Sequence, residues 1–407
     1  MDYRVYIIFA ALTALGIYFL HREGLMEKPL SAAGCLLLLL GAMALRAFFM
    51  DYETLDYQNF LTRWVQFYRD NGGFKALDRS VGNYNIPYLY FMALFSYSGI
   101  RDLYLIKSLS IFFDLLLAWG CAMVLRQFTD SVPRRILCFF TVLYLPTVFL
   151  NSAVWAQCDA IYVALAVLGI ALALEDRPAA SMVMMALSFG FKLQAVFILP
   201  VCAVLWLKGK YKLRHFLVFP LTYVILVLPA VIAGRPFIET LTLYTSQTGS
   251  IGSGLNYNSP SVFAIITDVE DTKLASKIAV LCAFAYMLLV LLVAFLCRRR
   301  LSNTAAMVFA ALFAVGIPFI LPHMHDRYFF AADILTLLLA FILPITAPLA
   351  ALTQFASLLG YHAYLKMRYL LLMDRGACAL ILVLCCLLVT LFETLSEKNI
   401  SDSKFKA

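Results

Sequence analysis

Apolar runs of about 17–25 residues recur along the chain, and they restrict its possible folds more than any other feature. Each run is long enough to cross a hydrocarbon core of roughly 30 Å as a helix. A closed β-barrel would instead need short segments in which apolar and polar residues alternate. The composition agrees with helices, because 63% of the 407 residues are hydrophobic and only 14% are charged. The sequence therefore predicts an all-α polytopic membrane protein.

We expect about thirteen membrane-spanning helices from these runs. The first run has no small-residue cleavage site and is followed by another run, which favours a retained helix over a secretory signal. Several runs are short, as is typical of helices that end inside a cavity. We expect a single domain, residues 1–407, with a polar tail at 395–407. The expected helices cover residues 4–20, 30–49, 103–125, 136–152, 160–175, 178–192, 195–207, 215–233, 276–297, 304–321, 328–344, 347–364 and 377–394.

Basic residues in short loops account for much of the net charge of +8. This distribution is typical of membrane topology signals and implies no nucleic-acid partner. Placing the basic loops in the cytoplasm puts the loops at 51–90, 234–275 and 322–327 together on the outer side. The basic loop at 366–375 then also lies outside, contrary to the positive-inside rule. The loops assigned to the cytoplasm are Arg126–Arg135, Lys208–Arg214 and Arg298–Arg300.

The stretch Asp51–Tyr90 is the first long polar interruption between apolar runs. Its pattern predicts an amphipathic helix that lies flat on the membrane and ends at Gly72 and Gly73. Asn85 then opens an apolar segment too short and too rich in tyrosine to count as a crossing. A plain surface helix with solvated carboxylates is the alternative. The expected apolar stripe is Tyr57, Phe60, Leu61, Trp64, Val65, Phe67 and Tyr68, opposite Gln58, Asn59, Arg63 and Gln66.

Three further stretches place polar residues beside apolar runs: Asn151–Asp159, Lys192–Gln194 and His323–Tyr328. Ionisable and amide residues in such positions usually carry function or pair with one another. For Lys192, the alternative is an end residue whose ammonium extends to the membrane surface.

The stretch His323–Tyr328 has the atom types of a metal site, but alternate residues in a short loop rarely converge on one ion. We expect no metal there. Arg327 suits an anion better, because its guanidinium matches the geometry of a phosphate and stays charged; a simple headgroup anchor is the alternative. The ten cysteines lie mostly inside apolar runs and form neither a zinc pattern nor a disulfide framework.

Taken in order between residues 45 and 345, these motifs resemble the GT-C superfamily of polyprenyl-phosphate-sugar-dependent glycosyltransferases. They are most similar to the bacterial integral membrane proteins related to the second GPI mannosyltransferase. Two positions depart from the family pattern, since Ala156 stands where glycine is expected and Ser259 where alanine is more usual. The motifs that carry the resemblance are Asp51-Tyr52, Asp56-Tyr57, Phe60, Trp64, GGFKAL at 72–77, NYNIPYLY at 83–90, NSAVWAQCDAIY at 151–162, FKLQA at 191–195, NYNSPS at 256–261 and HMHDRYF at 323–329.

The resemblance implies an inverting transferase that moves one hexose, mannose-like or glucose-like, from a polyprenyl-phosphate-sugar donor to a glycan or glycolipid acceptor. It places the general base on Asp56, with Asp51 as the alternative, in an external catalytic loop at 51–90. It implies no cofactor and no essential divalent cation, and an active site outside a bacterial plasma membrane. The donor phosphate is assigned to Arg327, His325 and Lys192, and substrate contacts to Trp64, Asn85, Tyr88, Gln157, Asp159, Gln194, Asn256, Asn258, His323 and Asp326.

Two other functions fit an apolar chain with these polar stretches. A lipid-linked sugar flippase or transporter would group its polar residues near the middle of the membrane, around broken helices. A polysaccharide polymerase would also use lipid-linked sugars outside the cell, but would join whole repeat units. The polar stretches of this chain map to the expected outer ends of helices, which favours an enzyme.

Overall fold

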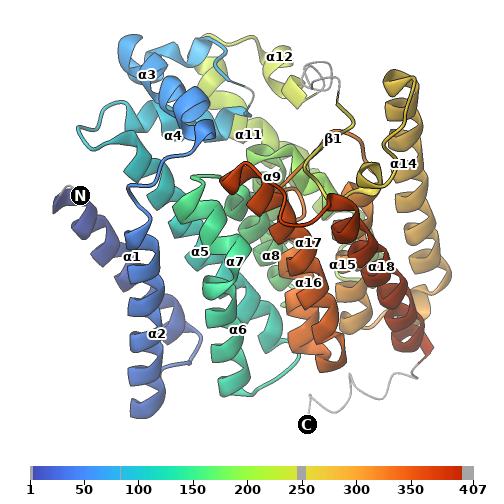
Figure 1. Cartoon of the computed structure of the whole chain (residues 1–407). Coiled ribbons are helices and arrows are strands. Elements are labelled where there is room, and N and C mark those ends of the chain that lie inside the picture. Colours follow the sequence, from blue (N-terminus) through green and yellow to red (C-terminus); the bar gives the residue numbers. More distant parts are fainter. Residues whose placement is uncertain (1–2, 83, 245–253, 397–407) are drawn as a thin grey trace. The chain divides into compact units, whose positions relative to one another are not determined.

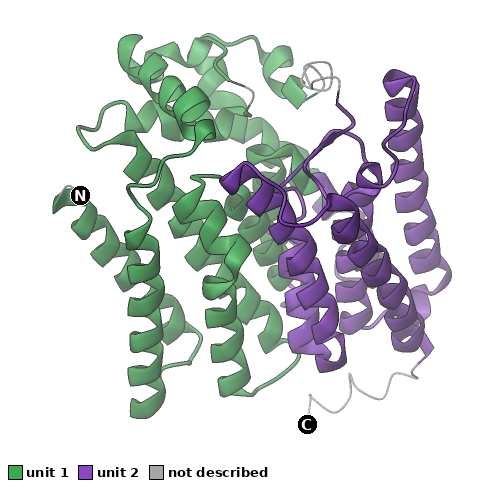
Figure 2. Ribbon diagram, in the orientation of Figure 1, with its two compact units in different colours: residues 1–172, 179–195, 216–251 green, residues 173–178, 196–215, 252–407 purple. Residues whose placement is uncertain are grey.

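The computed structural model describes residues 3–82, 84–244 and 254–396, and nearly all of their regular structure is helical (Figure 1). The chain divides into two compact units (Figure 2). Unit 1 comprises residues 1–172, 179–195 and 216–251, and unit 2 comprises residues 173–178, 196–215 and 252–407. The all-α fold predicted from the apolar runs is confirmed.

Unit 1 contains most of the first half of the chain. Its helices, wholly or mainly in this unit, are α1 (Tyr3–Arg22), α2 (Pro29–Phe48), the π-helix η1 (Tyr57–Leu61), α3 (Thr62–Asp70), the 3-10 helix η2 (Gly73–Asp78), α4 (Ile86–Phe95), α5 (Asp102–Arg126), α6 (Val132–Tyr144), α7 (Pro146–Phe149), the π-helix η3 (Leu150–Val154), α8 (Asp159–Leu174), α9 (Pro178–Phe191), the 3-10 helix η4 (Leu193–Phe197), α11 (Val218–Ile232) and α12 (Phe237–Leu241).

Unit 2 combines helices with one short strand pair. Its elements, wholly or mainly in this unit, are α10 (Val201–Leu207), η5 (Leu213–Leu217), β1 (Asn256–Tyr257), η6 (Val262–Ala264), α14 (Thr272–Leu296), η7 (Arg298–Arg300), α15 (Asn303–Ile320), β2 (Met324–His325), α16 (Phe330–Ile342), η8 (Pro344–Thr346), α17 (Ala347–Lys366) and α18 (Met373–Ser396). The parallel pairing of β1 with β2 aligns Asn256 with Met324 and Tyr257 with His325. No strand was expected in these two loops.

Seven helices of the described residues are long and apolar enough to cross a membrane, as in a multi-pass membrane protein. Every expected span overlaps helical structure, but the expected count of about thirteen is not confirmed. The expected span at 347–364 lies in α17, which is not among the seven. Four expected spans are helices of 10–17 residues, namely α8, α9, Leu193–Leu207 and α16. The long spans are α1, α2, α5, Leu213–Ile232, α14, α15 and α18.

The expected span at 136–152 is broken. Pro146 has no backbone N–H to continue α6, and the residue before a proline avoids helical geometry. The chain therefore bends by 44° between Val132–Tyr144 and Pro146–Val154, which makes at most one bent span. Beyond the bend, η3 leads into the polar stretch that begins at Asn151.

The amphipathic stretch after α2 forms two consecutive helices, η1 and α3, which end before Gly72. Both Gly72 and Gly73 adopt positive φ angles, so the expected stop is confirmed. The expected apolar stripe is partly wrong, because Phe60 is exposed and Phe67 is only half-buried. The wider turn of the π-helix explains this difference, since it shifts side chains around the axis relative to an α-helix.

The short apolar segment after Asn85 forms α4, which has ten residues. At 1.5 Å per residue it is roughly 15 Å long, about half the thickness of the hydrocarbon core. It is too short to cross the membrane alone, in agreement with the prediction.

A fully buried ion pair anchors η3 within unit 1. Arg46 of α2 donates two hydrogen bonds, at 2.9 and 2.8 Å, to Asp114 Oδ2 of α5. The Ser152 hydroxyl donates to the same oxygen at 2.6 Å. Buried charges are tolerated when paired and hydrogen-bonded in this way. The pair therefore fixes η3, and with it the polar segment that follows, against α2 and α5.

Candidate active site

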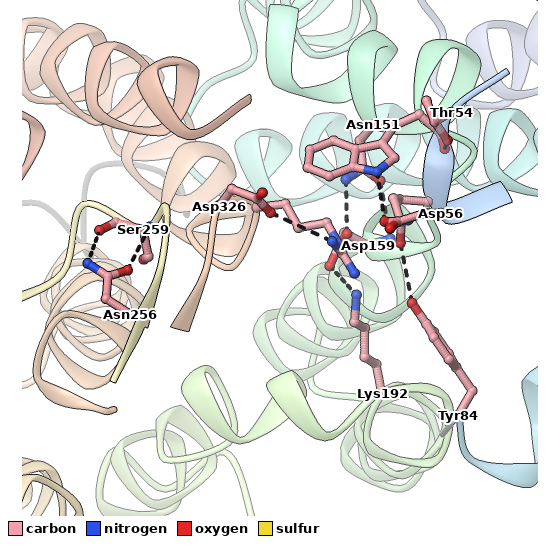
Figure 3. Close-up of polar contacts among 12 residues, drawn as sticks. Thr54, Asp56, Tyr84, Asn151, Asp159, Lys192, Asn256, Ser259 and Asp326 are labelled. Carbon is pink, nitrogen blue, oxygen red and sulfur yellow. Dashed lines mark hydrogen bonds and ion pairs between the residues drawn. The ribbon is translucent and has the colours of Figure 1, made fainter. Parts of the chain in front are cut away.

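The Asp56 carboxylate accepts two hydrogen bonds from side chains about one hundred residues further along the chain (Figure 3). Its Oδ2 atom accepts from Trp155 Nε1 at 2.9 Å and from Gln157 Nε2 at 2.8 Å. Asp56 lies at the start of η1 and is half-buried. Two donors held by packed structure restrict the orientation of this carboxylate. The structure thus brings together Asp56 and Gln157, which the sequence presents in separate motifs.

The segment that carries these donors has a fixed and unusual backbone. The Gln157 N–H donates to Asn151 O at 2.8 Å, and Ser110 Oγ donates to Gln157 O at 2.6 Å. Ala156 has a φ of 64°, in the left-handed region that favours glycine. This conformation costs an alanine about 1–2 kcal/mol. It gives a physical reason for the glycine expected before Gln157.

A second carboxylate, that of Asp159, is fully buried behind this segment. It accepts a hydrogen bond from Asn151 Nδ2 at 2.9 Å and forms an ion pair with Lys192 at 2.5 Å (Figure 3). The Lys192 ammonium also lies 5.8 Å from the ring centre of Tyr84 and 6.0 Å from that of Tyr162, within the range of cation–π attraction. Lys192 is therefore not a solvated end residue, and its charge is shared with Asp159.

Aromatic side chains lie beside the Asp56 network. The phenol of Tyr84 donates to Gln157 Oε1 at 3.3 Å, so it contacts the residue that orients Asp56. Tyr84 packs edge-on against Trp64 and lies 4.9 Å from Tyr88 between ring centres. A Cβ atom at Gly82 would lie 2.4 Å from the Trp64 ring, so this close approach requires glycine. Trp64 and Tyr88, expected to contact substrate, are both buried and support Tyr84.

A buried lysine holds the loop between α2 and η1. Lys107 Nζ donates to the carbonyl oxygens of Phe49, Met50 and Tyr52 at 2.7, 3.3 and 2.6 Å. A cation at a helix C-terminus neutralises carbonyl groups that have no partner within the helix. Lys107 therefore determines how the chain leaves α2 on its way to Asp56.

Two further contacts fix the same loop. Thr54 Oγ1 donates to Trp155 O at 3.1 Å, which joins the loop directly to the donor segment. The Tyr104 phenol donates to Asp51 Oδ1. Asp51 is exposed, whereas Asp56 is half-buried.

Buried phenols of η1 and α3 are not candidate bases. Tyr57 donates to Asp102 Oδ1 at 3.0 Å, and burial raises the pKa of its phenol. Burial also raises the pKa of Tyr68 to about 12. Both side chains therefore stay protonated at neutral pH, which leaves carboxylates as the bases of this region.

Asn85 has a structural role in unit 1. Its Oδ1 caps α4 by accepting from Ile86 N at 2.9 Å, and its Nδ2 donates to Gly190 O and Tyr223 OH at 2.8 and 3.2 Å. Its expected contact with substrate stays a prediction. Gln194, also expected to contact substrate, lies half-buried in η4.

In unit 2, the two histidines of the 323–329 motif differ. His323 has a φ of 60°, and its ring nitrogens contact Gly254 O at 2.6 Å and Ser276 Oγ at 3.0 Å. His325 lies in β2 and stacks on Tyr257, with ring centres 4.7 Å apart. His323 therefore holds the fold of unit 2, and the expected contact of His325 with the donor phosphate stays a prediction.

The asparagines of the 256–261 motif shape a turn beside β1. Asn256 Nδ2 donates to Ser259 O at 2.9 Å, and Asn256 Oδ1 accepts from Ser259 N at 2.8 Å (Figure 3). Asn258 adopts a φ of 56°, and its side-chain oxygen accepts from Tyr369 OH at 2.5 Å. Both amides are thus engaged within unit 2.

Asp326 and Arg327 follow β2 and are both largely buried. Their side chains are 3.7 Å apart, too far for a strong charge-assisted hydrogen bond. Among the residues that the structure describes, no group of three histidine, cysteine or acidic side chains is arranged to hold a metal ion.

The expected site residues divide between the two units. Asp51, Asp56, Trp64, Asn85, Tyr88, Gln157, Asp159, Lys192 and Gln194 belong to unit 1, and Asn256, Asn258, His323, His325, Asp326 and Arg327 belong to unit 2.

Comparison with protein-family models and with curated proteins gave no match. Membership of the GT-C superfamily therefore stays a prediction from the motifs.

Sequence reasoning missed three residues that hold the Asp56 loop: Thr54, Lys107 and Trp155. Trp155 stood inside a quoted motif without a role, and a tryptophan between polar residues was an available signal. Lys107 was the only lysine inside the apolar run 103–125, and a charge in such a run marks a specific interaction.

Proposed function

We propose that this protein is a membrane glycosyltransferase that moves one sugar from a polyprenyl-phosphate-sugar to a hydroxyl group of a glycan or glycolipid, with Asp56 as general base. The observation that carries the proposal is the half-buried Asp56 carboxylate, oriented by Trp155 and Gln157. The motif resemblance to the GT-C superfamily supports the same assignment.

A sugar hydroxyl is a weak nucleophile at neutral pH, so its attack requires a base within hydrogen-bond reach of its proton. In the proposed reaction, the acceptor oxygen bonds to the anomeric carbon while the bond from that carbon to the lipid phosphate breaks. The proton passes to Asp56, and the lipid phosphate leaves with the electron pair. Attack opposite the leaving group inverts the configuration, and no covalent sugar–enzyme intermediate forms.

The leaving phosphate needs charge stabilisation more than protonation. The resemblance assigns this role to Arg327, His325 and Lys192. Arg327 suits it best, because a guanidinium forms two parallel hydrogen bonds to a phosphate. Lys192 suits it least, because its ammonium already forms an ion pair with Asp159. The proposed reaction requires no metal or cofactor.

The substrate class fits a chain built from apolar helices. A polyprenyl tail is as hydrophobic as the lipid bilayer, so its enzyme needs membrane helices around a polar site. The positive-inside rule favours an extracytoplasmic site, and the resemblance favours a bacterial plasma membrane.

Purified protein in liposomes, supplied with polyprenyl-phosphate-mannose or polyprenyl-phosphate-glucose and a membrane glycolipid extract, tests the proposal. Mass spectrometry should detect an acceptor that gains one hexose, and NMR should show the inverted anomeric configuration. Asp56→Asn protein is the matched control and should form no detectable product in the same time. Movement of intact donor across the bilayer without transfer would identify a flippase, and transfer of several sugars at once would identify a polymerase. Either result would overturn the proposal.

A further inference from the structure

The turn between α17 and α18 is unusual for its exposed apolar residues. The turn covers residues 367–372, after α17 ends at Lys366 and before α18 begins at Met373. Its large apolar side chains are 47–73% exposed. They are Met367, Tyr369, Leu370, Leu371 and Leu372.

This turn is also basic. Lys366, Arg368 and Arg375 are all exposed in and around it. Among the described residues, the only ion pair of these three cations joins Arg375 to Asp374 at 3.8 Å, on the surface. A surface pair of this kind contributes little to stability. The turn keeps a net positive charge, because its three cations outnumber its one carboxylate.

The turn lies at the end of unit 2 opposite to Arg298–Arg300. Tyr369 donates to Asn258, which directly follows β1. The start of α14 is at the same end, because Ser276 contacts His323, whose backbone N–H donates to the residue before β1. α14 then runs away from this end and finishes before Arg298–Arg300. A basic turn at the end of unit 2 opposite to the basic loop Arg298–Arg300 is contrary to the usual topology signal and requires another explanation.

Three contacts anchor the turn and the start of α18 within unit 2. Arg368 O lies 3.0 Å from His362 Nδ1, and a Cβ atom at Gly376 would lie 2.9 Å from the Pro260 side chain. Together with the Tyr369–Asn258 bond, these contacts leave the apolar and basic side chains displayed on a fixed backbone. A preformed surface binds with a smaller loss of conformational entropy.

We infer that residues 366–375 form an interfacial docking element for anionic phospholipids of the outer leaflet. Leu370, Leu371 and Leu372 enter the boundary between headgroups and acyl chains, where burial of their apolar surface strengthens membrane binding. Lys366, Arg368 and Arg375 bind the phosphodiester groups, because clustered basic residues at a membrane surface attract anionic lipids. This inference does not depend on the proposed enzymatic function.

Photo-cross-linking in nanodiscs with equal amounts of phosphatidylglycerol and phosphatidylcholine tests the inference. The photoreactive residue p-benzoylphenylalanine replaces Leu371, and mass spectrometry identifies the cross-linked lipids. The matched control carries it at Phe392, an exposed residue of α18 within a membrane-spanning helix. We expect phosphatidylglycerol to exceed phosphatidylcholine by at least about threefold at position 371 and to equal it at position 392.

Two variations test the electrostatic part. The triple change Lys366→Gln, Arg368→Gln and Arg375→Gln should lower the ratio at position 371 to that at position 392. High salt should lower the ratio in the unchanged protein, because exposed charges are screened. Equal cross-linking of both lipids at position 371 with the basic residues intact would overturn the inference. So would cross-links to protein or to no lipid, because the turn would then bind another protein or remain in water.

Discussion

Asp51 and Asp56 lie in the same loop and have the same side chain, but the structure gives them different surroundings. Asp56 is half-buried and receives two hydrogen bonds from Trp155 and Gln157. Asp51 is exposed and receives one from Tyr104. The difference shows that long-range packing, rather than local sequence, determines the burial and the hydrogen-bond partners of each carboxylate. Asp56 is the better candidate base because its orientation is restricted before substrate binds.

The largest effect should come from replacing the two aspartates in turn. Asp56→Asn removes the proposed base and should lower kcat by about a thousandfold, within the usual contribution of general-base catalysis. Asp51→Asn keeps a hydrogen-bond acceptor for Tyr104 and should leave kcat within about threefold of the unchanged protein. Sugar transfer by purified, folded variants measures both. Equal losses in the two variants would remove the distinction between the aspartates.

The next effect concerns the groups that orient each carboxylate. Gln157→Leu and Trp155→Phe each remove one donor to Asp56 and should lower kcat by about 10–100-fold, the usual value of a hydrogen bond to a charged group. KM should change little, because both side chains hydrogen-bond directly to the proposed base. Tyr104→Phe removes the donor to Asp51 and serves as the matched control, with a small effect on kcat. A rise in KM without a fall in kcat in either donor variant would contradict this role.

Replacing Lys107 tests the anchor of the loop that carries both aspartates. Lys107→Met leaves buried carbonyl groups without their donor and should lower the free energy of unfolding by about 1–3 kcal/mol. A thermal-shift assay in detergent measures the fall in Tm, and Lys75→Met at an exposed position is the control. Lys107→Arg should restore part of the Tm lost in Lys107→Met, because it restores a donor to the loop. An unchanged Tm in Lys107→Met would contradict the anchoring role.

The smallest effect should come from relieving backbone strain at Ala156. Ala156→Gly should raise stability by about 1 kcal/mol, because glycine adopts a positive φ without steric cost. Ala153→Gly, three residues earlier and inside η3, should lower stability by a similar amount, because glycine is less favourable than alanine within a helix. A lower Tm in Ala156→Gly would show that the left-handed conformation is not strained.

Much of the fold could be predicted, because the requirements of a membrane determine it. Apolar runs predict helices directly, and each of the expected ranges overlaps helical structure, although the range 136–152 is bent before Pro146. Gly72 and Gly73 end the amphipathic stretch because their φ angles are positive. Glycine adopts such angles readily, so the pair is a local signal in the sequence. Asn85 begins α4 as an N-cap residue, which is another local signal.

The remainder depends on contacts between distant segments or on local irregularities. The hydrogen bonds from Trp155 and Gln157 to Asp56 join positions about one hundred residues apart, and no periodicity indicates them. The π-helix η1, which leaves Phe60 exposed, is only one turn long. Its sequence pattern therefore cannot be distinguished from that of the α-helix that follows it. The β1–β2 pair depends on two loops that meet only in the folded unit.

The most direct measurement is a single-turnover experiment on Asp56→Asn protein in liposomes, loaded with polyprenyl-phosphate-[14C]mannose or its glucose equivalent and then mixed with acceptor. Our account predicts that the variant binds the labelled donor as tightly as the unchanged protein but keeps it intact, while the unchanged protein transfers the label in its first turnover. Transfer of the label by the variant at an unchanged rate would contradict the assignment of Asp56 as the base.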